Sequence, residues 1–141
     1  MKKKTSKILR ITMLSILALI LVTQLFYLPR YWMKRTEIIP SESTGEELII
    51  MSANVRCYAP DDLFQKSWFY RANLLANDIA EVAPDVIGFQ EVQGVHYNYL
   101  KSAMSGYESI IAFRDNSIIQ EGCAIFYRAD RFEKIEEGSF G

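Results

Sequence analysis

The chain has 141 residues, with 16 basic and 17 acidic side chains and a formal net charge of −1. This near-neutral net charge gives no indication of a surface that binds nucleic acid, although a cleft can still be basic locally. A single histidine and two widely separated cysteines exclude the paired spacing that is typical of structural zinc sites. The length leaves room for one small folded domain.

The N-terminus combines a basic start with a long uncharged stretch. Residues 1–10 hold five lysine or arginine side chains, and residues 11–28 then contain no charged residue. A helix needs roughly 17–25 apolar residues to cross the bilayer core. We therefore expect residues 11–28 to form a transmembrane signal anchor that contacts the lipid bilayer. The basic excess before the span predicts a cytoplasmic N-terminus and a domain outside the cytoplasm.

Two other interpretations of residues 11–28 remain open, a cleaved signal peptide and a buried core helix. A signal peptide should be followed by small residues at its cleavage site, whereas the flank here is bulky, aromatic and basic. Tyr27, Tyr31 and Trp32 in that flank are suited to a membrane interface, where amphipathic rings collect. These features favour an uncleaved, single-pass protein of the cell membrane.

Residues 29–47 are predicted to be a juxtamembrane linker, because the stretch from Glu37 to Glu47 is rich in turn-forming and acidic residues. The candidate domain is then residues 48–141. A domain of this size buries only a small core, and its stability is marginal without reinforcement.

The first part of the domain has a strand–helix–strand pattern. Leu48–Val55 and Asp85–Gln90 are short apolar runs, as expected of buried strands. Between them, apolar residues recur every three or four positions from Trp68 to Val82, which predicts a helix that ends before Pro84. Such a crossover joins parallel strands, so their carboxyl ends should lie at one edge of the sheet.

The rest of the domain adds one helix and at least two strands. We expect a βαβαββ order, which is an α/β pattern. The predicted elements are a helix over Val95–Met104, strands over Tyr107–Phe113 and Gly122–Arg128 around the polar loop Arg114–Glu121, and the start of a fifth strand over Phe132–Glu137.

Polar side chains stand at the ends of the two predicted parallel strands. Asn54 closes the first strand, and Gln90-Glu91 closes the second. A carboxylate at the sheet edge suits Mg²⁺, which prefers oxygen ligands and takes one or two carboxylates from the protein.

These motifs resemble the endonuclease/exonuclease/phosphatase superfamily over the whole of residues 48–141. The resemblance rests on the order and spacing of several weak motifs. They are Asn54, Trp68-x-x-Arg71, Pro84-Asp85, Gln90-Glu91, the run Glu121–Arg128 with Asp130-Arg-Phe132, and Glu137-Gly-Ser-Phe140.

The resemblance implies a metal-dependent phosphoester hydrolase, of nuclease or phosphatase type, whose fold packs two sheets face to face. It implies that Asn54 contacts the phosphate and orders the metal site, and that Glu91 is the principal ligand of Mg²⁺ or another divalent cation. Arg114 and Asp115 occupy a loop that lies near the substrate in some members. Here Phe113 replaces the glycine of that motif, and a surface loop of paired charges is the alternative.

The family's general base is a histidine supported by an aspartate, found in Gly-Asp-x-Asn and Ser-Asp-His motifs that this chain lacks. The only histidine, His96, is expected to be structural or exposed. We therefore expect a truncated N-terminal half that is inactive alone and has the missing C-terminal half as a possible partner. The alternative is a non-catalytic membrane-anchored module that binds a phosphorylated ligand or a partner chain. The substrate class and a disulfide between Cys57 and Cys123 stay open.

Overall fold

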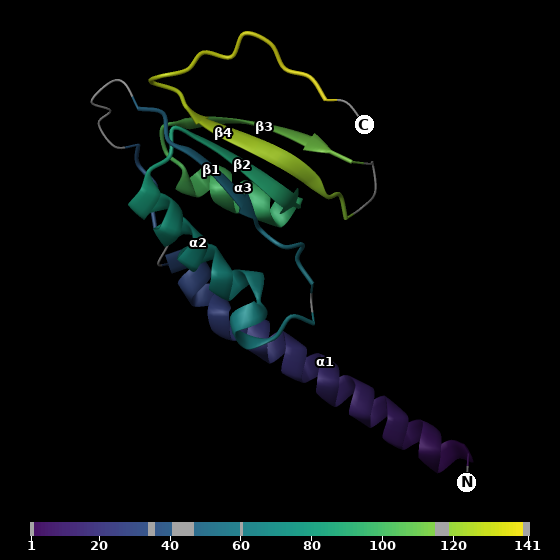
Figure 1. The fold of residues 1–141 in the computed structure, drawn as a ribbon. Helices are drawn as coiled ribbons and strands as arrows, with labels where there is room; N and C mark the ends of the chain where they lie inside the picture. The colour runs from purple at the N-terminus through teal and green to yellow at the C-terminus, as the bar shows by residue number, and fades with distance from the viewer. Residues whose placement is uncertain (1, 34–35, 41–46, 60, 115–118, 140–141) are drawn as a thin grey trace.

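The computed structural model describes residues 2–33, 36–40, 47–59, 61–114 and 119–139. It confirms an α/β fold in which the βαβαββ order follows one long N-terminal helix (Figure 1). The elements are α1 Lys2–Met33, β1 Ile50–Asn54, the short 3-10 helix η1 Phe64–Lys66, α2 Trp68–Val82, β2 Val86–Val92, α3 Gly94–Ala103, β3 Tyr107–Phe113 and β4 Gly122–Arg128.

The described strands form one sheet in the order β1-β2-β4-β3. Strands β1 and β2 are parallel, as the sequence predicts, and Asn54 pairs with Gln90 at their carboxyl ends. Strand β4 is antiparallel to both of its neighbours, β2 and β3. Helix α2 makes the crossover between β1 and β2, so it runs in the direction opposite to theirs.

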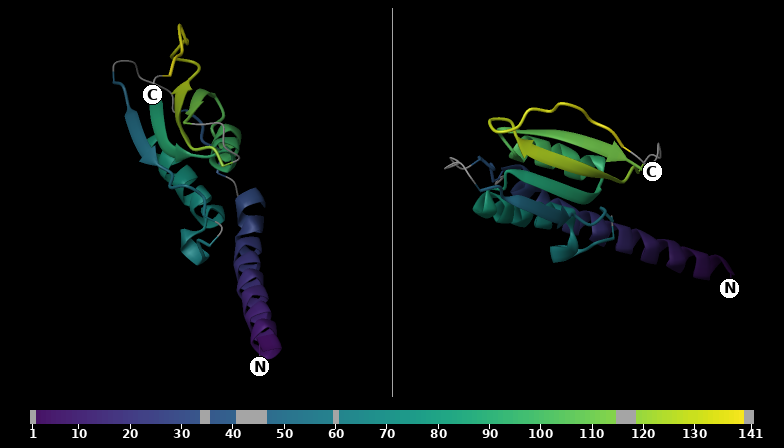
Figure 2. Two further views of the ribbon diagram at one scale, coloured as in Figure 1. Left: turned by 90° about the vertical axis from the view of Figure 1, so that its right-hand side faces the viewer. Right: turned by 45° about the horizontal axis from the view of Figure 1, so that its top comes forward.

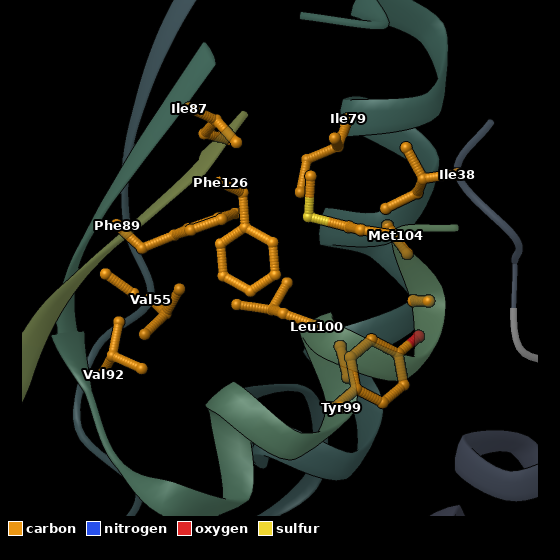
Figure 3. Close-up of a cluster of buried hydrophobic side chains, with 14 of the residues drawn as sticks. Ile38, Val55, Ile79, Ile87, Phe89, Val92, Tyr99, Leu100, Met104 and Phe126 are labelled. Atoms are coloured by element: carbon orange, nitrogen blue, oxygen red, sulfur yellow. The ribbon is translucent and has the colours of Figure 1, made fainter. Parts of the chain in front are cut away.

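The core lies between the sheet and helices α2 and α3, which cover one face (Figures 1 and 3). Trp68, Ala72 and Ile79 project from the predicted apolar face of α2 and are fully buried. They meet side chains that alternate along the strands. The labelled members of this cluster in Figure 3 are Ile38, Val55, Ile79, Ile87, Phe89, Val92, Tyr99, Leu100, Met104 and Phe126.

Among the described residues, no helix covers the opposite face of the sheet. Ile50, at 69% exposure, and Ile125, at 44%, point to this side. The C-terminal segment passes over this face as an irregular strap (Figures 1 and 2). Residues 132–139 form no strand, which corrects the prediction of a fifth strand over Phe132–Glu137. The side chain of Ile135 is 97% exposed, so this segment lacks the partner strand and the burial that would fix it in a ladder.

Helix α1 is longer than the predicted span. It continues through Pro29 to Met33, so residues 29–33 of the expected linker are helical. By length and composition, Ser6–Met33 could cross a membrane, a criterion that a signal sequence near the N-terminus also meets. The last turns of α1 pack along α2, whereas the earlier part projects away from the domain (Figure 1).

Two residues of the expected linker, residues 29–47, belong to the core. Tyr31 is only 4% exposed and its ring lies 5.1 Å from that of Phe69 and 4.9 Å from that of Tyr99. It therefore packs inside the domain and is not available to a membrane interface. Ile38 is fully buried, and its N–H donates to the carbonyl of Ala103 at 2.7 Å.

A buried ion-pair network joins the start of β2 to the end of β4. The carboxylate of Asp85 accepts the N–H of Ile49 at 2.8 Å and contacts Arg131 at 2.6 Å and Arg128 at 3.4 Å. Burial raises the pKa of Asp85, but the Ile49 hydrogen bond and the two arginines outweigh it and hold this pKa below its usual value. Arg128 also pairs with Asp130 at 2.6 Å.

We expect Asp85→Ala to lower the free energy of unfolding by about 3 kcal/mol, because the buried Arg128 guanidinium then loses one of its two carboxylate partners. Chemical denaturation of the full chain in detergent measures this loss. The matched control is Asp78→Ala on the exposed side of α2, which should change stability by less than about 0.5 kcal/mol. Equal stabilities for the two variants would show that the network is energetically neutral.

Candidate active site

The carboxyl ends of β1 and β2 form the candidate site. Asn54 is the last residue of β1, and Glu91 lies near the end of β2. Glu91 has a φ of 58°, in the left-handed region that is uncommon for residues other than glycine. The β2–β4 register shifts between Phe89 and Val92, so Glu91 sits in an irregularity of the strand. Such irregularities redirect side chains next to active sites.

The redirected Glu91 carboxylate meets the end of β1 and the loop that follows it. Its Oε1 accepts a hydrogen bond from the Asn54 side-chain amide at 2.7 Å, and its Oε2 accepts the N–H of Cys57 at 2.9 Å. The Asn54 Oδ1 in turn accepts the N–H of Arg56 at 2.8 Å. The two residues that the sequence singled out are therefore in direct contact, and both are held in position by backbone donors.

The surroundings keep Glu91 charged. Hydrogen bonds from Asn54 and from the Cys57 N–H, together with the charge of Arg56, lower the pKa of Glu91. Burial of the Cys57 thiol, with Glu121 and Glu91 nearby, raises its pKa to about 11. Cys57 is therefore a neutral thiol near neutral pH and no nucleophile, and in this structure both Cys57 and Cys123 are free thiols.

Arginine side chains brace the loop between β1 and α2. Arg71, from the Trp-x-x-Arg motif, donates to the carbonyls of Val55 and Lys66, each at 2.8 Å. Arg56 forms an ion pair with Asp62 at 3.0 Å. Sequence reasoning singled out Arg71 only as part of a motif, and the geometry shows why that position is suited to an arginine: its guanidinium donates to two carbonyls at once.

Arg114, from the second pair of candidates, lies at the same edge of the sheet, because Gly122 pairs with both Val92 of β2 and Phe113 of β3. Arg114 follows the end of β3, its side chain is exposed, and its N–H donates to the carbonyl of Glu121 at 2.8 Å. Asp115 lies outside the described residues. Sequence reasoning named Glu121 only as the first residue of the motif Glu121–Arg128, whereas the structure places it as a second carboxylate beside Cys57. This contact could not be predicted from the sequence, because it depends on the pairing of β4 with β2.

His96 is part of the core and not of the site. It is fully buried, and its ring lies 4.4 Å from that of Trp68. Its Nδ1 accepts the N–H of Gln93 at 3.0 Å, which caps the start of α3. Burial and the nearby Arg71 lower the pKa of His96 to about 4. A neutral imidazole enclosed by the core cannot reach a water at Glu91, so it does not supply the general base.

The donor set fits a hard cation such as Mg²⁺. Glu91 offers a charged carboxylate, and Asn54 offers an amide beside it. In the part of the chain that the structure describes, no three His, Cys, Asp or Glu residues gather as a metal cluster. One carboxylate is within the usual requirement of Mg²⁺, which keeps several waters and also binds substrate phosphates.

A family comparison identifies the fold. The model of the endonuclease/exonuclease/phosphatase family matches residues 51–137, which include both site residues. The chain belongs to this family. Carbon catabolite repressor protein 4 homolog 3 of Arabidopsis thaliana is 33% identical over 79 residues, which are 52% of this chain and 17% of that protein.

Solved structures of the endonuclease/exonuclease/phosphatase family show the same arrangement. A mannosyl-6-phosphatase of Bacteroides thetaiotaomicron is 30% identical, with a TM-score of 0.57 over 65% of this chain and 35% of its own. A family member from Bacteroides vulgatus is 26% identical, with a TM-score of 0.54 over 60% of this chain and 33% of its own. The chain thus spans about a third of these solved relatives.

The buried His96 predicts a pH-dependent stability. Its folded pKa of about 4 lies below the unfolded value of about 6.5, so the unfolded chain binds more protons between these values. Stability should therefore fall by up to about 3 kcal/mol as the pH drops from 6.5 to 4. Denaturation at several pH values measures the fall, and His96→Gln should show a flatter curve. The same slope in both proteins would contradict the assignment to His96.

Proposed function

We propose that the chain carries the metal- and phosphate-binding part of a membrane-anchored, exported phosphoester hydrolase that depends on Mg²⁺ or another divalent cation. The observation that carries this proposal is the 2.7 Å hydrogen bond between Asn54 and Glu91. It lies at the edge of the sheet within the region that matches the family. Glu91 would hold the cation, and Asn54 would contact the phosphate and keep the carboxylate oriented. A bound cation would polarise the phosphoryl oxygen and stabilise charge on the leaving oxygen.

The proposed anchor is α1. Its uncharged stretch, its exposed apolar side chains from Ile8 to Val22 and the basic residues before them support a single-pass membrane helix with a cytoplasmic N-terminus. The sheet and its site would then lie outside the cytoplasm.

The catalytic base is proposed to come from outside these 141 residues. His96 is buried, so this chain's own groups can hold and orient a phosphoester but cannot activate water as the family does. In the part of the chain that the structure describes, no helix covers the sheet face that bears Ile50 and Ile125, and this face would accept the second sheet of the family fold. The same burial of His96 favours the alternative, an anchored module that binds a phosphorylated ligand without cleaving it.

Glu91→Gln tests the metal site. The change keeps the side-chain size but removes the charge, so the affinity of the full chain for Mn²⁺ should fall at least about tenfold, or about 1.4 kcal/mol. Titration followed by electron paramagnetic resonance measures this affinity in detergent. Glu136→Gln, in the exposed C-terminal segment, is the matched control and should bind as the wild type does. Unchanged Mn²⁺ affinity in a folded Glu91→Gln protein would end the proposal.

The topology is tested with reporters fused after Gly141. A reporter that is active only after export should be active at this position, because the basic excess holds the N-terminus in the cytoplasm. A reporter that works only in the cytoplasm should be silent at the same position. The reverse pattern would place the site on the cytoplasmic side.

A further inference from the structure

Helix α1 runs parallel to α2, and the contacts along the pair fix this direction. Gln24 contacts Asp62 and Ser67 just before α2, and the carbonyl of Arg30 accepts the Asn73 side-chain amide at 2.8 Å. Positions later in α1 thus meet positions later in α2. Thr23 and Gln24 are buried, whereas the side chains from Ile8 to Leu19 and at Leu21 and Val22 are exposed.

The N-terminal part of α1, which does not pack on the domain, projects from the side of the domain that bears the candidate site. Helix α2 runs opposite to β1 and β2, so its N-terminus lies at the edge where those strands end. Because α1 is parallel to α2, its projecting N-terminal part extends beyond that same edge, as Figures 1 and 2 show. The segment from Asp61 to Lys66 lies between the site and the projecting helix, because Asp62 contacts both Gln24 of α1 and Arg56 beside the site.

The geometry leaves no spacer between the domain and a bilayer. Exposed apolar side chains recur along α1 from Ile8 to Phe26, a length of about 28 Å at the rise of an α-helix. This length is close to the roughly 30 Å of a hydrocarbon core, and snorkelling accommodates the charge of Arg10. The buried Thr23 and Gln24 lie near the end of this stretch, so the membrane surface meets the domain there.

The loop that meets this surface presents an apolar side chain and a basic one. Phe64, on η1, is 58% exposed, and its backbone has a φ of 53°. Lys66 at the end of η1 is also exposed. The loop is tied to α1, because Gln24 donates to the Asp62 carbonyl at 2.8 Å and accepts from the Ser67 hydroxyl. An aromatic ring beside a lysine is suited to the headgroup region of a bilayer.

We infer that the segment from Asp61 to Lys66 rests on the membrane and turns Asn54 and Glu91 toward the headgroup layer, so that the phosphoester bound there belongs to a membrane lipid. This inference rests on the proposed anchoring of α1. With the membrane surface at Thr23 and Gln24, this edge of the sheet would face the headgroup layer, which contains the lipid phosphates. A rigid helix, without a flexible tether, keeps the site at that level and holds substrate and site at high effective concentration.

Depth measurements on the full chain test the orientation. Lys66→Cys, at the end of η1 just before α2, and Glu81→Cys, near the end of α2, are labelled with a fluorophore in a Cys57→Ala, Cys123→Ala background. The proteins are placed in phosphatidylcholine vesicles that contain a lipid with a nitroxide on its headgroup. Quenching should be several-fold stronger at Lys66 than at Glu81. Gln24→Leu, which removes the contacts to Asp62 and Ser67 but keeps α1 apolar, should reduce this difference.

Lipid capture tests the substrate side of the inference. A benzophenone on Arg56→Cys, beside the site, should cross-link to vesicle lipid on irradiation, and one on Glu81→Cys should not. Vesicle flotation after an alkaline wash is measured first. A chain that does not float overturns both the anchoring and this inference. A chain that floats, but is quenched equally at Lys66 and Glu81 or captures no lipid from Arg56, overturns this inference and leaves the anchoring intact.

Discussion

The parallel pairing of β1 with β2 is the constraint on which the site depends. It places Asn54 opposite Gln90, and the left-handed backbone at the next residue turns Glu91 back toward the end of β1. Had β2 continued as a regular strand, the Glu91 side chain would alternate to the face opposite Gln90, toward the helices. The contact between Asn54 and Glu91 thus requires both a long-range register and one strained residue.

The sequence predicts much of the fold because its patterns are local. The apolar period of Trp68 to Val82 and the short runs on either side give the crossover, and the polar residues that end those runs give Asn54 and Glu91 as neighbours. The bulge at Glu91 could not be predicted, because a positive φ in a glutamate is imposed by the strands around it. The position of Glu121 beside Cys57 could not be predicted for a related reason, since it depends on the pairing of β4 with β2.

Other differences arise where tertiary packing overrides composition. Tyr31 and Ile38 lie in a region that is basic, aromatic and turn-rich, which is typical of a flank or linker. In the structure they fill gaps between α2 and α3 that a small domain cannot leave empty. Phe132–Glu137 shows the reverse, because this run has the composition of a strand but pairs with no strand among the residues that the structure describes. His96 illustrates a third case, in which a residue type associated with catalysis caps a helix inside the core.

The packing of Tyr31 also bears on whether proteolysis could release the domain from the proposed membrane anchor. A cut anywhere after Met33 and before Ile38 would release the sheet without Tyr31, and would uncover the rings of Phe69 and Tyr99 that it contacts. Losing a buried aromatic side chain costs about 3–5 kcal/mol, a large share of the roughly 5–15 kcal/mol that stabilises a typical domain. A soluble shed form would therefore be short-lived, because release would begin to unfold the domain.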